Sequence, residues 1–127
     1  MKRVFKTRHF CRWMRKTELT NDALCAAVDE MVQSLIDADL GRGVVKKRVG
    51  LASRGKRSGA RTLVATNKGD RWFFVFGFEK NVRANIRGDE REALQDIAQD
   101  LLARTGAQLD LTVEDGALEE ICDGHKD

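Results

Sequence analysis

The sequence lacks proline and tyrosine altogether, and its 127 residues include only two histidines. Without tyrosine, no phenol can donate or accept a proton in catalysis. His9 falls in a short amphipathic segment and His125 among the last three residues, so we interpret both as incidental. No stretch approaches the roughly 20 apolar residues that span a bilayer, and the start lacks the apolar run of a signal peptide. We therefore expect a cytoplasmic protein with no membrane partner.

Cysteine is also scarce, and the three cysteines show no C-x-x-C spacing. Cys11 and Cys25 fall within predicted helices, where a free thiol usually behaves as a small buried apolar residue. We interpret these two and Cys122 as reduced structural residues, and we expect neither a metal nor a cofactor.

Length and composition indicate one globular domain. The hydrophobic share of 42% and the charged share of 34% are normal for a folded protein. No repeat or low-complexity linker divides the chain. We expect residues 1–127 to form one domain in which 106–127 is an acidic C-terminal extension.

The spacing of apolar residues predicts an alternation of strands and helices. In chain order we expect a strand at 3–7, a helix at 8–16, a helix from Thr20 or Asn21 to Gly41, a strand from Val44, a loop at 52–60, strands at 61–66 and 71–78, a helix at 89–104, a helical turn at 109–115 and an extended segment at 118–122. The three middle strands should form an antiparallel meander, with the aromatic strand 71–78 inside the sheet.

The second predicted helix carries a wide apolar stripe. Leu24, Val28, Met31 and Leu35 belong to it, and we expect them to be buried against the sheet. The predicted fold class is α+β: a small, twisted, mostly antiparallel sheet with two N-terminal helices on one face, a C-terminal helix, and the basic strand and loop left open.

Charge is distributed unevenly along the chain. Residues 1–82 carry 18 lysines and arginines against 8 acidic residues, whereas residues 83–127 carry 5 against 12. The densest basic segment, 42–61, has no acidic residue and eight cations: Arg42, Lys46, Lys47, Arg48, Arg54, Lys56, Arg57 and Arg61. A solvated face usually mixes both signs of charge. The segment therefore favours a polyanionic partner such as nucleic acid, whose phosphates bind such clusters.

Part of this segment begins like a phosphate-binding loop, but the match fails. Gly50-x-x-x-x-Gly55-Lys56 is followed by Arg57 in place of the hydroxyl residue, and then by a strand instead of a helix. With no histidine or tyrosine available, RNA cleavage would depend on cations that stabilise the pentavalent phosphate. A lysine with a lowered pKa could also accept the 2′-hydroxyl proton.

The order of these elements over about residues 1–104 resembles the RelE/HigB toxins of the RelE/ParE superfamily. The segment Arg54-Gly55-Lys56-Arg57-Ser58-Gly59-Ala60-Arg61 is similar to the Gly-Lys-Arg-Gly-Gly-x-Arg segment of HigB-like members. The sequence Phe78-Glu79-Lys80-Asn81 after the aromatic strand is also similar. The resemblance implies a RelE-like fold and an endoribonuclease that cuts messenger RNA, usually in the ribosomal A site. It also implies a cognate antitoxin, which we expect to be a helix-turn-helix protein.

The resemblance further implies site residues. RelE uses two basic residues at alternate positions of the strand before the loop, matched by Lys46 and Arg48, and an arginine that opens the next strand, matched by Arg61. Its further arginine falls near Lys80, and its C-terminal tyrosine has no counterpart around Ile86. We therefore predict a catalytic set of Lys46, Arg48, Arg61 and Lys80. The predicted RNA-binding residues are Lys47, Arg54, Lys56, Arg57 and Asn81.

Two alternatives remain open at this stage. The same cations suit a non-catalytic RNA- or DNA-binding module, including a degenerate toxin that binds and does not cut. A ParE-like relative would share the fold and inhibit DNA gyrase.

Overall fold

The computed structural model describes residues 2–51 and 55–122, and for residues 55–58 it describes the backbone alone. These residues form a mixed α+β structure with one six-stranded sheet and four helices. The elements are β1 (Arg3–Thr7), α1 (Arg8–Met14), α2 (Asn21–Val32), β2 (Ala38–Gly41), β3 (Val44–Leu51), β4 (Gly55–Thr66), β5 (Arg71–Glu79), α3 (Gly88–Leu102), α4 (Gly106–Glu114) and β6 (Leu118–Ile121).

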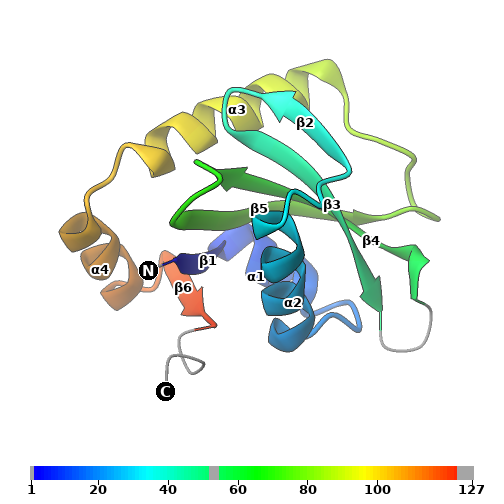
Figure 1. Ribbon diagram of the computed structural model, residues 1–127, viewed down its shortest axis with the longest axis horizontal. Helices are drawn as coiled ribbons and strands as arrows, with labels where there is room; N and C mark the ends of the chain where they lie inside the picture. The colour runs from blue at the N-terminus through cyan, green and yellow to red at the C-terminus, as the bar shows by residue number, and fades with distance from the viewer. Residues whose placement is uncertain (1, 52–54, 123–127) are drawn as a thin grey trace.

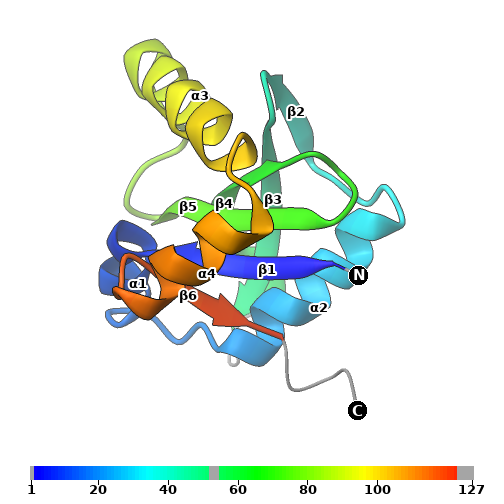
Figure 2. The same cartoon turned by 90° about the vertical axis from the view of Figure 1, so that its left-hand side faces the viewer.

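The strands lie in the order β2-β3-β4-β5-β1-β6 (Figures 1 and 2). β1 runs parallel to β5, and the other four pairings are antiparallel. The predicted meander of β3, β4 and β5 is confirmed, and so is the interior position of the aromatic strand β5. Because β1 lies between β5 and β6, the start of the chain pairs with its C-terminal part.

Side-chain caps start the two N-terminal helices. The Thr7 hydroxyl accepts a hydrogen bond from the Phe10 N–H at 3.2 Å, and the Thr20 hydroxyl accepts one from the Ala23 N–H at 3.1 Å. Each satisfies a backbone donor that has no partner within the helix. The first cap takes the chain directly from β1 into α1, and the second confirms Thr20 as the N-cap of α2.

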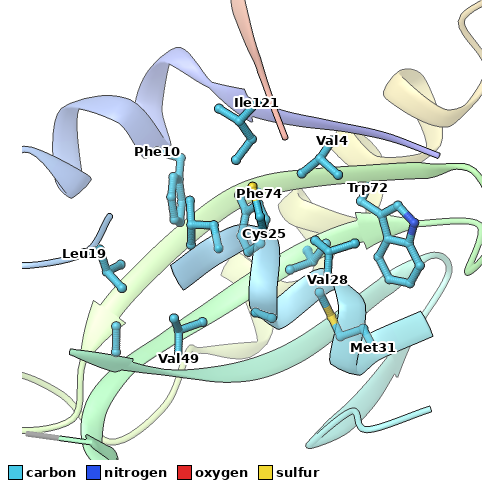
Figure 3. Close-up of a cluster of buried hydrophobic side chains, with 14 of the residues drawn as sticks. Val4, Phe10, Leu19, Cys25, Val28, Met31, Val49, Trp72, Phe74 and Ile121 are labelled. Atoms are coloured by element: carbon cyan, nitrogen blue, oxygen red, sulfur yellow. The ribbon is translucent and has the colours of Figure 1, made fainter. Parts of the chain in front are cut away.

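Apolar side chains pack on both faces of the sheet. On one face, residues of α1 and α2 such as Phe10 and Val28 join Trp72 and Phe74 of β5 (Figure 3). On the other face, α3 and α4 contribute Leu94, Ala98, Leu101 and Leu109 to a second cluster with sheet residues. Figure 2 shows α3 and α2 on opposite sides of the strands. Since both faces are covered, β5 reads as apolar on both sides.

The second helix is shorter than the sequence predicts. α2 ends at Val32, Ser34 has a positive φ of 71°, and β2 follows at Ala38 in place of further helix. Leu24 is fully buried, but Leu35 is 55% exposed, so its predicted burial was wrong. The physical reason is that Leu35 lies beyond the helix end and no longer belongs to the helical stripe.

The interpretation of the cysteines was wrong for two of the three. A disulfide joins Cys25 of α2 to Cys122, which directly follows β6, with a Cα–Cα distance of 5.7 Å. The pairing of β6 with β1 carries Cys122 to α2 across 97 residues of sequence. Cys11 is a free thiol whose pKa is raised by burial.

The acidic extension is part of the fold as far as residue 122, the last one described. α4, a positive φ at Gly116 and β6 match the predicted helical turn, stop and extended segment. Arg3 of β1 pairs with Glu120 of β6 at 2.8 Å. Nearby, the buried Lys6 ammonium lies 3.4 Å from Glu119. The acidic residues of β6 thus bind cations of β1. Within the described residues, every helix is too short or too polar to cross a membrane.

Candidate nucleic-acid interface

Lys46, Arg48 and Arg61 lie on one face of the sheet, and we call these three residues the cationic triad. Alternation along β3 places Lys46 and Arg48 on the same side. Arg48 lies directly opposite Arg61 in the register of β3 and β4, and opposed residues of antiparallel strands share a face. The structure therefore brings together three of the four predicted catalytic residues through strand geometry alone.

The three side chains differ in their exposure. Arg61 is only 8% exposed, its Nη1 donates to the Gly59 carbonyl at 3.4 Å, and its cross-strand neighbour on β5 is Phe78. Lys46 is half-buried. Arg48 is the outermost, with a side chain that is 50% exposed. A phosphate would thus meet Arg48 in water and Arg61 in a drier environment, where charges interact more strongly.

An acidic residue lies against the outermost member of the triad. The Asp37 carboxylate accepts a hydrogen bond from the Arg48 backbone N–H at 2.7 Å, and it lies 3.6 Å from the Arg48 Nε. Asp37 precedes β2, the strand that pairs with β3. This contact holds the Arg48 side chain and partly neutralises it.

Lys47 lies on the opposite face from the cationic triad. It is 4% exposed, its ammonium is 2.7 Å from the Glu30 carboxylate, and it donates to the Leu35 carbonyl at 2.8 Å. These contacts hold α2 and the chain after it against β3. We therefore leave Lys47 out of the RNA-binding surface that the sequence predicted, because its charge already has a structural partner.

The predicted glycine-rich loop is shorter than expected. β4 begins at Gly55, which pairs with Leu51 of β3, so the loop predicted at 52–60 was wrong for its second part. The predicted RNA-binding residue Arg54 lies outside the described residues, and so do the side chains of Lys56 and Arg57.

Lys80 and Asn81 are exposed in the turn that follows β5. Glu79 lies opposite Ala60, so this turn begins near the strand position of Arg61. No described contact joins Lys80 to the cationic triad.

Arg83 is a cation of this region that sequence reasoning missed. Its guanidinium lies 5.7 Å from the ring centre of Phe78 and 6.0 Å from that of Phe76. It also forms a bidentate pair with Glu90 of α3, whose pKa is lowered mainly by this hydrogen bond. Phe78 lies opposite Arg61 in the register of β4 and β5, so Arg83 packs on a ring next to the strand position of the triad. The sequence did contain a signal for this contact, because an arginine a few residues after Phe76 and Phe78 can pack over their rings.

His9 was interpreted as incidental, but it contacts one of these two phenylalanines, Phe76. It is exposed at the start of α1, and its ring stacks on Phe76 with 5.6 Å between ring centres. The spacing of residues in the sequence gave no sign of this contact, since α1 ends at Met14 and β5 begins only at Arg71.

Taken together, the geometry suits binding of a phosphate chain along β3 and β4. The triad supplies guanidinium and ammonium donors on one face, and such donors form charge-assisted hydrogen bonds with phosphate oxygens. The same donors can stabilise the extra negative charge of a pentavalent phosphate.

Comparisons with known proteins identify the family of the chain. The family model described as "RelE toxin of RelE / RelB toxin-antitoxin system" matches residues 2–121. The match extends beyond the 1–104 region of the sequence resemblance, through α4 and β6. A search of curated proteins found no match. Because the family model spans nearly the whole chain, the chain belongs to the RelE family of toxins from toxin–antitoxin systems.

Proposed function

We propose that this toxin is a ribosome-dependent messenger RNA endonuclease that inhibits translation in the cytoplasm. The observation that carries the proposal is the cross-strand pair of Arg48 and Arg61, with Lys46 on the same face, in a chain of the RelE family. Toxins of this family are generally endoribonucleases. The family also implies a cognate antitoxin, and we propose a helix-turn-helix protein for that role.

In the proposed reaction, the 2′-hydroxyl oxygen of one nucleotide attacks the adjacent phosphorus. The bond from phosphorus to the 5′-oxygen breaks, which leaves a cyclic phosphate and a 5′-hydroxyl, and the proton lost by the 2′-oxygen is balanced by one gained at the 5′-oxygen. Arg61 stabilises the pentavalent phosphate from its buried position, while Arg48 and Lys46 hold the neighbouring phosphate oxygens. Lys80 is proposed to reach the leaving oxygen from the turn after β5.

The remaining cations are proposed to bind the RNA chain without taking part in the reaction. Lys56 and Arg57 lie at the start of β4, Arg54 comes directly before this strand in the sequence, and Asn81 follows Lys80. Contacts of this kind position a strand by its phosphates and carry little sequence information. Sequence preference must then come from elsewhere on the surface or from the ribosome.

A second candidate is a toxin relative that binds RNA without cutting it. The ion pair between Arg48 and Asp37 favours this alternative, because it occupies a cation that the reaction requires. Both functions use the same face, so binding alone does not separate them.

The deciding experiment compares cleavage and binding in matched variants. We expect wild-type protein to arrest growth on induction and to cleave ribosome-bound messenger RNA. Arg61→Ala should lower the cleavage rate by about a hundredfold or more with a much smaller loss of RNA affinity, because a transition-state contact is removed. Arg15→Ala removes an exposed arginine from the end of α1 and is the charge-matched control.

Two outcomes would contradict parts of the proposal. If folded wild-type protein leaves ribosome-bound messenger RNA intact, the endonuclease is wrong and the binding module replaces it. If Arg61→Ala reduces affinity and cleavage by equal factors, the role given to Arg61 is wrong. Because Arg61 is buried, Arg61→Lys is tested beside it, and circular dichroism spectra confirm that both variants fold.

A further inference from the structure

An open pocket of about 440 Å³ lies between α1 and the last part of β5. β1 pairs with β5 only as far as Lys6 opposite Phe74, and the chain then turns into α1. Among the described residues, no strand pairs with β5 on this side beyond Phe74. The edge of β5 therefore faces a helix, which leaves room for a ligand. The volume lies within the range of about 300 to 1,000 Å³ that is usual for small-molecule sites.

Aromatic side chains line this pocket from both elements. The exposed His9 of α1 stacks on Phe76 of β5, with 7° between the ring planes. One helical turn later, the Trp13 ring rests against the strand at Gly77. A Cβ atom at Gly77 would lie 2.3 Å from that ring, so only glycine allows the indole to lie this close to the backbone.

The rim of the pocket is mainly basic and partly apolar. Arg83 lies over Phe76 and Phe78, while Arg12 of α1 and Lys16, shortly after this helix, are exposed. Val82 also lines the pocket and is 76% exposed, the highest value among the large apolar residues of the described chain. A partly uncovered indole, a stacked imidazole and flanking cations are the features with which proteins bind unpaired bases.

We propose that this pocket binds one unpaired nucleobase of RNA next to the cationic triad. The inference rests on the proposed function in taking RNA as the ligand. Phe78 connects the two sites, because it lines the pocket and lies opposite Arg61 on β4. A strand whose phosphates follow the triad would thus bring a base to β5. A nucleotide can place the flat face of its base against the aromatic rings and its phosphate against the basic rim. This combination favours RNA over a peptide.

Intrinsic fluorescence tests the proposal directly, because the chain contains only two tryptophans. Trp72 is fully buried, whereas Trp13 lines the pocket. We expect adenosine, guanosine, cytidine and uridine monophosphates to quench the emission, with affinities that depend on the base. Ribose 5-phosphate, which lacks a base, should have no effect. The Trp13→Phe variant keeps an aromatic ring and should lose the quenching.

Variants then locate the binding site. His9→Ala should weaken nucleotide binding by about tenfold, the usual effect of removing one stacking partner. Arg15→Ala, from the same helix but outside this pocket, should bind nucleotides as wild type does.

The outcomes separate this inference from the proposed function. If no nucleotide quenches the emission, or if ribose 5-phosphate quenches it equally, the base pocket is wrong even when RNA is cleaved. If no nucleotide binds and His9→Ala loses capture of the antitoxin, the pocket is a protein-docking site and the inference is also overturned. Base-dependent quenching in a protein that cleaves nothing supports the pocket and rejects the nuclease alone.

Discussion

Reduction of the disulfide between Cys25 and Cys122 should lower the free energy of unfolding substantially. The bridge closes a loop across 97 residues, most of the chain. Chain entropy for a loop of this length corresponds to about 4.7 kcal/mol at 25 °C, because the crosslink restricts the unfolded state. Residual structure in unfolded chains reduces such values, so we expect a measured loss of about 2 to 5 kcal/mol.

Urea unfolding of the oxidised and reduced protein measures this difference. Cys25→Ser should reproduce the reduced protein under oxidising conditions, and Cys11→Ser should not, because Cys11 is the free thiol. Thiol titration of the denatured, oxidised protein should detect one reactive thiol, and the reduced protein should show three. A stability difference below about 1 kcal/mol would refute the reasoning from loop closure.

The reduced form matters for the proposed function, because a cytoplasmic compartment keeps most thiols reduced. β6 still pairs with β1 over four residues, and the ion pair of Arg3 with Glu120 does not depend on the bridge. We therefore expect the reduced protein to keep its secondary structure in circular dichroism and to remain able to cleave RNA.

Three further predictions follow from the burial and pairing of single side chains. Lys47→Ala should cost about 1 to 3 kcal/mol in urea unfolding, since it leaves a partly buried carboxylate without its lysine, while RNA affinity stays unchanged. Lys46→Ala should instead weaken RNA binding and leave the free energy of unfolding nearly unchanged. Equal effects of both variants on RNA affinity would contradict the placement of Lys46 and Lys47 on opposite faces of the sheet. Leu24→Ala should cost about 2 to 5 kcal/mol, whereas Leu35→Ala should cost less than about 0.5 kcal/mol, and a large loss at Leu35 would contradict its exposure. The hydrogen bond from Arg83 lowers the pKa of Glu90 in the folded protein. The stabilisation from this ion pair is therefore fully present at pH values above the ordinary glutamate pKa, and it is lost as the pH falls through the lowered pKa. Glu90→Gln should therefore make the free energy of unfolding fall less steeply at acid pH. An unchanged pH dependence would argue against a contribution from this ion pair.

Periodicity in the sequence determined the main elements of the fold. The apolar spacing of α2 and the alternation of β3 come from residues close together in the chain, as does the threonine that caps α2. Backbone geometry converts these local patterns directly into helix and strand faces. For the same reason, the alternating pattern alone was enough to place Lys46 and Arg48 on one side of a strand.

The register between strands was harder to predict from the sequence. That Arg61 lies opposite Arg48 depends on where the β3–β4 hairpin turns, and the sequence predicted a longer loop than the structure has. Lys47 followed no apolar pattern, and its role became clear only when α2 placed Glu30 beside it. The same lysine in isolation is equally suited to RNA and to a buried ion pair.

Contacts between distant segments were decided by tertiary structure alone. The sheet order places β6 next to β1, and this brings Cys122 to Cys25. The parallel pairing of β1 with β5 places α1 beside the aromatic strand, so that His9 meets Phe76. Such pairings depend on which strands become neighbours and on how the two apolar faces are covered. No local pattern of residues encodes which strands become neighbours. The choice depends on burying the apolar surface of the whole chain.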